Sequence, residues 1–241
     1  MLLGIAFLGY YYKVNHEQKV SALPIIGTDN NHHISRFSFV NQDGKTITNE
    51  DVKGKICVVE YFFATCKGIC PKMNENMSKV YKAFLGNNKV LILSHTVDPV
   101  KDTVQALKAY SLRFDANADQ WMFLTGDKKA LYDMARYSYL INAEDTANGV
   151  TIKDDFIHDK HYTLVDGLGR VRGFYDGLEL TEINKLIADI NTLLIVGIQF
   201  WMCLMKWALN LHTKFIHQKL LMTTGQLFAL LKQLSIVQHS V

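Results

Sequence analysis

The sequence predicts an α/β fold in which helices cover both faces of one sheet. Segments with the pattern of strands alternate with segments of helical periodicity along the chain. Two of the expected strands are apolar without alternation, which is typical of strands buried on both faces. The chain has 241 residues, of which 49% are hydrophobic and 20% charged, enough for one sizeable core.

A hairpin and a long buried strand are the first expected elements. Residues 37–40 alternate in polarity and lead through a turn signal into a second short strand at 45–48. Residues 49–54 are expected to be a short connector. The strand at 55–63 is apolar inside except for Glu60, which places it at the centre of the sheet.

Helices and strands then alternate. Apolar residues recur on one face of residues 72–85, which predicts a helix that begins after a cysteine motif. A buried strand is expected at 89–94. Asp98 reads as an N-cap and Pro99 as the first helical residue of a helix that ends near residue 114.

The remaining elements complete a known pattern. In order they are a strand at 120–124, a helix at 127–137, a polar loop at 142–155, a hairpin of strands at 161–166 and 171–175, and a helix at 180–193. Alternating strands and helices that end in a hairpin and a helix are typical of a thioredoxin-like sandwich. The hairpin at the start is an addition to that sandwich.

The two ends of the chain differ from this domain, which is expected to occupy residues 30–194. Residues 1–29 read as a hydrophobic start and a linker. The apolar stretch 1–12 is shorter than the roughly 20 residues that span a bilayer. It is interpreted equally as part of a membrane anchor or as a packed or unstructured start.

Residues 195–241 are expected to be a hydrophobic tail. No Asp or Glu occurs from residue 191 onward, and Lys206 is the only charge in residues 192–211. That 20-residue stretch is long enough for a membrane helix. The alternative is a frame-disrupted or fused segment. No metal is assigned to the tail, although it contains Cys203.

Composition and charge exclude several classes of function. The net charge of +3 and the absence of a basic cluster argue against nucleic-acid binding. Four cysteines are too few for a disulfide scaffold. Cys57 lies in an apolar strand and is interpreted as a small buried hydrophobe.

The chemistry is expected at Cys66 and Cys70, which have three residues between them and follow a buried strand. Two thiolates on a loop suit Cu(I) or a dithiol–disulfide couple, but they are too few for a structural zinc site. Pro71 fits the first turn of a helix. The helix N-terminus, together with Lys67 and Lys72, is expected to lower the thiol pKa values.

A third ligand is expected from a histidine. His158 lies in a polar loop just before a hairpin strand, and a thioredoxin-like fold brings that loop beside the cysteines. His161, within the strand, is the competing candidate, and His95 is a weaker one. The histidines of the polar leader are expected to have no ligand role.

Several ordered motifs resemble those of the Sco/SenC family of copper-binding thioredoxin-like proteins, over residues 37–194. The motifs are the opening hairpin at 37–45 with Gly54-Lys55, the Cys-x-x-x-Cys-Pro run at 66–71, the Asp-Pro-x-x-Asp-Thr run at 98–103, and the spacing from His158 to Gly169 and then to Tyr175-Asp176-Gly177.

The resemblance implies that Cys66, Cys70 and His158 bind Cu(I) or Cu(II). Two positions depart from the family pattern. Lys67 follows the first cysteine where the family usually has proline, and Ile157 precedes the histidine where an acidic residue is usual. Neither change removes a ligand, but the first could alter the thiol pKa and the redox preference.

The resemblance implies a copper metallochaperone that serves the dinuclear copper centre of cytochrome c oxidase, rather than a turnover enzyme. Its partners would be the copper-bearing oxidase subunit and other copper chaperones or thioredoxin-like reductants. The expected location is the periplasmic, outer face of an inner membrane.

The alternative function is a thiol–disulfide oxidoreductase that keeps the acceptor cysteines reduced, which needs both cysteines but not the histidine. A peroxidase is weaker, because Thr65 stands next to Cys66 instead of three residues before it.

Overall fold

The structure is a computed structural model that describes residues 23–27, 32–141 and 159–195. The chain divides into two units, Met1–Leu194 and Ile195–Val241, and the description that follows concerns the first. The polar loop expected at 142–155 lies outside the described residues, as does the hydrophobic tail apart from Ile195. No helix in the described ranges is both long enough and apolar enough to cross a membrane.

The core is one seven-stranded sheet in the order β2-β1-β5-β4-β3-β6-β7. Its strands are β1 (Ser38–Asn41), β2 (Thr46–Thr48), β3 (Ile56–Phe62), β4 (Val90–Thr96), β5 (Trp121–Thr125), β6 (His161–Val165) and β7 (Val171–Asp176). The three central strands β5, β4 and β3 are parallel to one another. Strands β1 and β6 run antiparallel to them, and the edge strands β2 and β7 are in turn antiparallel to β1 and β6. The predicted thioredoxin-like α/β sandwich with an added hairpin is confirmed.

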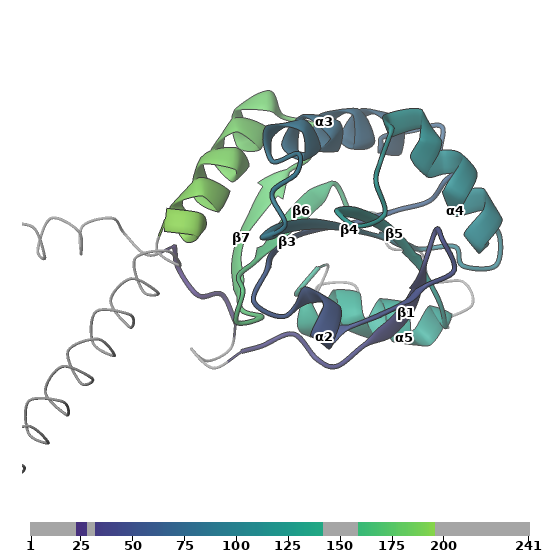
Figure 1. The fold of residues 1–241 in the computed structure, drawn as a ribbon, viewed down its shortest axis with the longest axis horizontal. Coiled ribbons are helices and arrows are strands. Elements are labelled where there is room, and N and C mark those ends of the chain that lie inside the picture. The colour runs from purple at the N-terminus through teal and green to yellow at the C-terminus, as the bar shows by residue number, and fades with distance from the viewer. Residues whose placement is uncertain (1–22, 28–31, 142–158, 196–241) are drawn as a thin grey trace, which may run out of the picture. The chain divides into compact units, whose positions relative to one another are not determined.

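Helices cover both faces of the sheet (Figure 1). They are α2 (Asn49–Val52), α3 (Cys70–Ala83), α4 (Val104–Ser111) with the 3₁₀ turn η1 (Leu112–Phe114), α5 (Lys128–Asp133) with the π-helical turn η2 (Met134–Ser138), and a last helix described over residues 180–195. Helices α3, α4 and the last helix lie on one face, and α2 and α5 lie on the other.

The alternation of side chains along β3 divides the core between these faces. Val58 and Phe62 pack toward α3 and α4, whereas Cys57, Val59 and Tyr61 pack toward α5. Every residue of β3 and β4 is buried, which is the reason that these strands lack alternation in sequence. Cys57 is only 2% exposed, so its interpretation as a buried hydrophobe is confirmed.

The connector expected at 49–54 joins β2 to β3 and contains the single helical turn α2. Asp51 stabilises the start of this turn by bonding back to Thr48, the residue before it. Its Oδ2 accepts hydrogen bonds from the Thr48 backbone N–H at 2.8 Å and from Thr48 Oγ1 at 3.1 Å. Asn49 Oδ1 also accepts a hydrogen bond from the Phe37 N–H at 2.7 Å. Local capping thus makes a turn that hydrophobic periodicity cannot indicate.

The helix expected from Asp98 begins later than predicted. Thr103 is its N-cap, with Oγ1 accepting from the Ala106 N–H at 3.3 Å. Residues 98–102 form a tight turn instead, closed by a 2.8 Å bond from the Asp102 N–H to the Asp98 carbonyl. Asp102 lies before the helix, and its carboxylate accepts a hydrogen bond from the Ala64 N–H in the loop that carries the cysteines.

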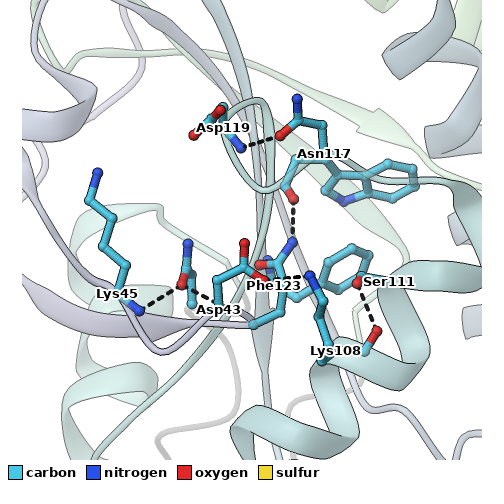
Figure 2. Close-up of polar contacts among 10 residues, drawn as sticks. Asp43, Lys45, Lys108, Ser111, Asn117, Asp119 and Phe123 are labelled. Atoms are coloured by element: carbon cyan, nitrogen blue, oxygen red, sulfur yellow. Dashed lines mark hydrogen bonds and ion pairs between the residues drawn. The ribbon is translucent and has the colours of Figure 1, made fainter.

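The added hairpin β1–β2 is fastened to the sandwich by polar contacts (Figure 2). The turn residue Asp43 pairs with Lys108 of α4 at 2.5 Å. Gln42 is buried, and its side-chain amide bonds to the backbone of β5 as a neighbouring strand would. Its Oε1 accepts from the Phe123 N–H at 2.9 Å, and its Nε2 donates to the Trp121 carbonyl at 2.8 Å. The hairpin therefore shields the edge of β5.

Candidate metal and thiol site

The two cysteines lie where the central strand β3 gives way to helix α3. Cys66 is in the loop after Phe62 and is half-buried, whereas Cys70 is the first residue of α3 and is 5% exposed. Pro71 stands in the first helical turn, as the sequence predicts. Both cysteines are free thiols, and Cys66 packs against the core cluster that contains Cys70. The structure thus brings two sulfurs together at one end of the sheet.

Burial, not the helix N-terminus, dominates the acidity of Cys70. Burial raises the pKa of the Cys70 thiol to about 12, and the neighbouring Cys66 side chain acts in the same direction. The expectation that nearby lysines and the helix N-terminus would lower this pKa is wrong, because Cys70 is packed against the apolar core beneath α3. A thiol in such a place loses its proton only when a metal or a base takes part.

Asp102 fixes the loop that carries Cys66. Its Oδ2 accepts a 3.0 Å bond from the Ala64 N–H, two residues before Cys66, and a 2.5 Å bond from Thr96 Oγ1 at the end of β4. Asp102 is 1% exposed, so both bonds lie out of water. The carboxylate therefore ties the cysteine loop to the neighbouring central strand.

We expect Asp102→Ala to lower the free energy of unfolding by about 3 kcal/mol, because two buried donors would lose their acceptor. Asp102→Asn is the matched control, since an amide oxygen in the same place can accept both bonds. Its cost should stay near 1 kcal/mol. Denaturant unfolding of the two variants measures the difference. Equal costs would show that the two bonds do not stabilise the loop.

Strand β6 begins near the end of β3 that leads into the cysteine loop. Strand β6 runs antiparallel to β3, with Thr163 opposite Val59, so His161 at the start of β6 lies toward the end of β3 from which the cysteine loop departs. His161 is half-exposed, and its Nδ1 lies 2.7 Å from Asp159 Oδ1. His158, the predicted ligand, lies outside the described residues and stays a prediction. No three His, Cys, Asp or Glu side chains within the described ranges gather into a metal site.

His95, the weaker candidate, is on the wrong face of the sheet. Its ring stacks on Tyr61 at 5.1 Å between centroids and meets the edge of Phe39 at 5.3 Å. These rings belong to the core under α5, whereas Cys70 belongs to the core under α3. Neither ring nitrogen of His95 has a hydrogen-bond partner among the residues that the structure describes. His95 is therefore a buried core residue that does not face the thiols.

His95 should make the fold sensitive to acid. Burial lowers the pKa of His95 to about 3, against about 6.5 in an unfolded chain. The unfolded state therefore binds the extra proton first, so stability is full above about pH 6.5 and falls as the pH drops toward 3. At about pH 5 the loss from this residue should be about 2 kcal/mol.

Denaturant unfolding of the wild-type chain and of His95→Phe, at about pH 7.5 and about pH 5, tests this. The variant should lose about 2 kcal/mol less than the wild type between the two pH values. His161→Gln, at a half-exposed histidine, should behave as the wild type. An unchanged loss in His95→Phe would contradict the assignment.

Two polar residues near the thiols were not given a role from the sequence. One is Asp102. The other is Glu60, a fully buried carboxyl in β3 that accepts a 2.5 Å bond from Ser94 Oγ. Ser94 Oγ in turn accepts a 2.8 Å bond from Trp121 Nε1. The signal for Glu60 was in the sequence: a single charge interrupts an apolar strand, six residues before Cys66.

The donor set decides which chemistry fits. Two neighbouring thiols that are not joined as a disulfide suit a soft metal ion such as Cu(I). The same pair of free thiols can also take part in a dithiol–disulfide couple. Two sulfurs alone are too few for a closed tetrahedral zinc site. The geometry thus fits copper and also fits thiol exchange.

Comparison with known proteins points to one family. Residues 27–195 match the family described as SCO1/SenC. The chain is similar to the crystal structure of a SCO1/SenC family lipoprotein from Bacillus anthracis, with 29% sequence identity and a TM-score of 0.58. The match covers 68% of this chain and 95% of that one.

Two further solved structures are similar. BsSco, described as a member of the Sco family of cytochrome c oxidase assembly proteins with a disulfide switch, has 30% identity and a TM-score of 0.56, covering 70% of this chain and 97% of its own. ScoI of Bradyrhizobium japonicum, solved with copper bound, has 25% identity and a TM-score of 0.53, covering 66% of this chain and 98% of its own.

Proposed function

The chain belongs to the SCO1/SenC family, and from this premise we propose that it is a metallochaperone that delivers copper to the dinuclear copper centre of a cytochrome c oxidase. The observation that carries the proposal is the pair of free, adjacent thiols at the start of α3. Supporting it, a similar protein, ScoI of Bradyrhizobium japonicum, holds copper, and BsSco belongs to a family of cytochrome c oxidase assembly proteins.

Copper is the cargo of this site, held by Cys66, Cys70 and His158. The thiolates supply soft ligands that favour Cu(I), and an imidazole completes the set. Asp102 holds the loop of Cys66 against β4. Pro71 restricts the backbone in the first turn of α3, directly after Cys70. Release to the acceptor proceeds by exchange of these ligands for those of the acceptor.

Transfer is tested by mixing the reduced, copper-loaded chain with the metal-free copper domain of a cytochrome c oxidase, without added reductant. The proposal expects copper to leave this chain and appear on the acceptor. Free copper at the same concentration, with a chelator present, is the control and should load the acceptor poorly. Copper that stays on the chain, or reaches the acceptor no better than chelated copper does, would contradict a delivery role.

A second function is favoured by one observation: the two thiols differ in exposure. Half-buried Cys66 can be reached by a disulfide of another protein. Buried Cys70 would then attack the mixed disulfide formed at Cys66. This asymmetry suits a thiol–disulfide oxidoreductase that reduces the acceptor cysteines before copper arrives. Such a role needs Cys66 and Cys70 but not His158.

We place the domain on the outer, periplasmic face of an inner membrane, where the copper domain of an oxidase is exposed. The similar protein of Bacillus anthracis is a lipoprotein, which supports association with a membrane. Fractionation of cells, followed by protease treatment of intact spheroplasts, tests this location. Degradation of the domain is expected, and complete protection would contradict it.

A further inference from the structure

The sheet ends at β7, and an extended segment from the start of the chain lies along this edge. Strand β7 is the last strand in the sheet order. Beside it, the Ile26 N–H donates a 2.9 Å hydrogen bond to the Val171 carbonyl and forms an antiparallel bridge (Figure 1). Exposed edge strands pair readily with other chains, and many folds cover them. The segment around Ile26 is therefore a candidate cover for the β7 edge.

Arg172 of β7 holds this segment by its backbone. Arg172 is only 5% exposed. Its Nε donates a 3.0 Å bond to the Pro24 carbonyl, and the same guanidinium donates to the Leu23 carbonyl. Arginine is rarely buried unless its donors are paired, and its planar fork of donors suits two neighbouring acceptors. Arg172 thus binds two consecutive carbonyls of an extended segment.

Asp166 sets the direction of the Arg172 fork. Its Oδ2 accepts a 2.6 Å bond from Arg172 Nη1. Its Oδ1 accepts bonds from the backbone N–H groups of Leu168 and Arg170, at 2.9 and 3.0 Å, in the turn between β6 and β7. All these groups belong to the β6–β7 hairpin. The domain itself therefore builds the site that receives the segment.

The register of the bridge limits how far the segment pairs with β7. With Ile26 opposite Val171, a continued antiparallel ladder would place Pro24 opposite Gly173. Proline has no N–H to donate to such a ladder, which is the reason that prolines in sheets are confined to edges. The Pro24 carbonyl bonds to Arg172 instead. The segment thus covers β7 without itself becoming a strand that invites further pairing.

The start of the chain contacts both faces of the sheet. Leu23 packs against the core under α3, whereas Ile34 packs against the core under α5. The Ile34 N–H donates a 2.8 Å bond to the Gly169 carbonyl at the β6–β7 turn, and the Ser35 N–H donates a 3.1 Å bond to Ser138 Oγ. We call residues 23–27 and 32–36 the strap, because they are fastened on both sides of the β7 edge.

We propose that the β7 edge is a docking site for an extended peptide segment, and that the strap, fastened by Arg172, occupies it and closes it to a second copy of the chain. The strap then belongs to the folded domain instead of serving as a linker. Without the strap, two copies would pair through their β7 strands, because identical edges associate about a two-fold axis. The inference is independent of copper and of the thiols.

Hydrogen exchange on the full chain, resolved to single residues by mass spectrometry, tests the fastening. The Ile26 amide should exchange slowly in the wild type and at least about tenfold faster in Arg172→Gln, because charge-assisted bonds to the strap are lost. Equal rates in these two chains would overturn the proposal. A wild-type Ile26 amide that exchanges as fast as that of an unstructured peptide would overturn it as well.

Arg170→Gln is the matched control. Arg170 pairs with the same carboxylate, with its Nε 2.9 Å from Asp166 Oδ2, and its replacement leaves the bonds from Arg172 to the strap in place. The Ile26 amide of this variant should exchange as in the wild type. Exchange accelerated as much as in Arg172→Gln would show that the hairpin ion pairs, and not the fastening, protect Ile26, and would overturn the proposal.

Pairing of two copies is measured by cross-linking a mixture of isotope-labelled and unlabelled full chains with an amine-reactive reagent. Lys185 is the reporter, since its Nζ lies 5.1 Å from the centre of the Tyr175 ring in β7. Links that join Lys185 of a labelled chain to Lys185 of an unlabelled one should be at least about tenfold more abundant in Arg172→Gln than in the wild type or Arg170→Gln. Equal abundance in the three chains would overturn the proposal.

A second variant decides the matter if Arg172→Gln does not fold. Ile26→Pro removes the N–H that bonds to the Val171 carbonyl and keeps the buried pair of Arg172 and Asp166. It should raise the number of mixed Lys185 links above the wild-type level, and an unchanged number would overturn the proposal. Because neither measurement uses copper or a thiol reaction, failure of this inference is separate from failure of copper delivery.

Discussion

Replacing either Cys66 or Cys70 with serine is expected to abolish stable copper binding. A serine hydroxyl is a hard, protonated ligand at neutral pH, whereas Cu(I) prefers soft thiolates. One remaining sulfur cannot hold the ion against a competing chelator. Loss of an outer-shell partner typically weakens a metal site 10- to 100-fold, so loss of a thiolate should weaken it by at least about a hundredfold.

Cys57→Ser is the matched control for this prediction. Cys57 is a third free thiol, buried in the core on the opposite face of the sheet from Cys70. Its replacement should reduce stability but leave copper binding intact. The measurement is competition with a Cu(I) chelator under anaerobic conditions. Copper retention in Cys66→Ser or Cys70→Ser at the wild-type affinity would show that the thiol pair is not the copper site.

His158→Ala is expected to weaken copper binding strongly, at least about tenfold and closer to a hundredfold, while leaving disulfide exchange between Cys66 and Cys70 intact. The matched control is His161→Ala. His161, the competing candidate, lies toward the end of β3 from which the cysteine loop departs, and its loss should change copper affinity little when His158 is the ligand. The same chelator competition compares the two variants. A larger loss in His161→Ala would transfer the ligand role from His158 to His161.

The order of the elements and the place of the thiols followed from periodicity. Strand β3 is apolar because both faces of the sheet are covered, and Pro71 marks the first turn of α3. These are signals that a sequence carries locally. The position of Cys66 in a loop and Cys70 at a helix start was therefore predictable without coordinates.

Other features depended on contacts between segments distant in the chain. The capping role expected of Asp98 belongs to Thr103 instead, because Asp102 bonds to Thr96 and Ala64. The expected acidity of Cys70 was wrong because helix and charge effects are visible in sequence, whereas depth of burial is not. The sequence places His95 near the end of one buried strand and the thiols after another, which suggests one end of the sheet for both. In the structure they pack on opposite faces of the sheet.

Copper delivery requires that this chain bind copper through its thiol pair and a histidine. The most direct measurement is copper stoichiometry on the fully reduced chain, with X-ray absorption at the copper edge to identify the ligands. We expect one copper per chain with two sulfur ligands and one nitrogen ligand, and loss of the nitrogen in His158→Ala. A reduced wild-type chain that binds no copper and still forms a reversible Cys66–Cys70 disulfide would contradict the copper-delivery account and leave only the thiol–disulfide function.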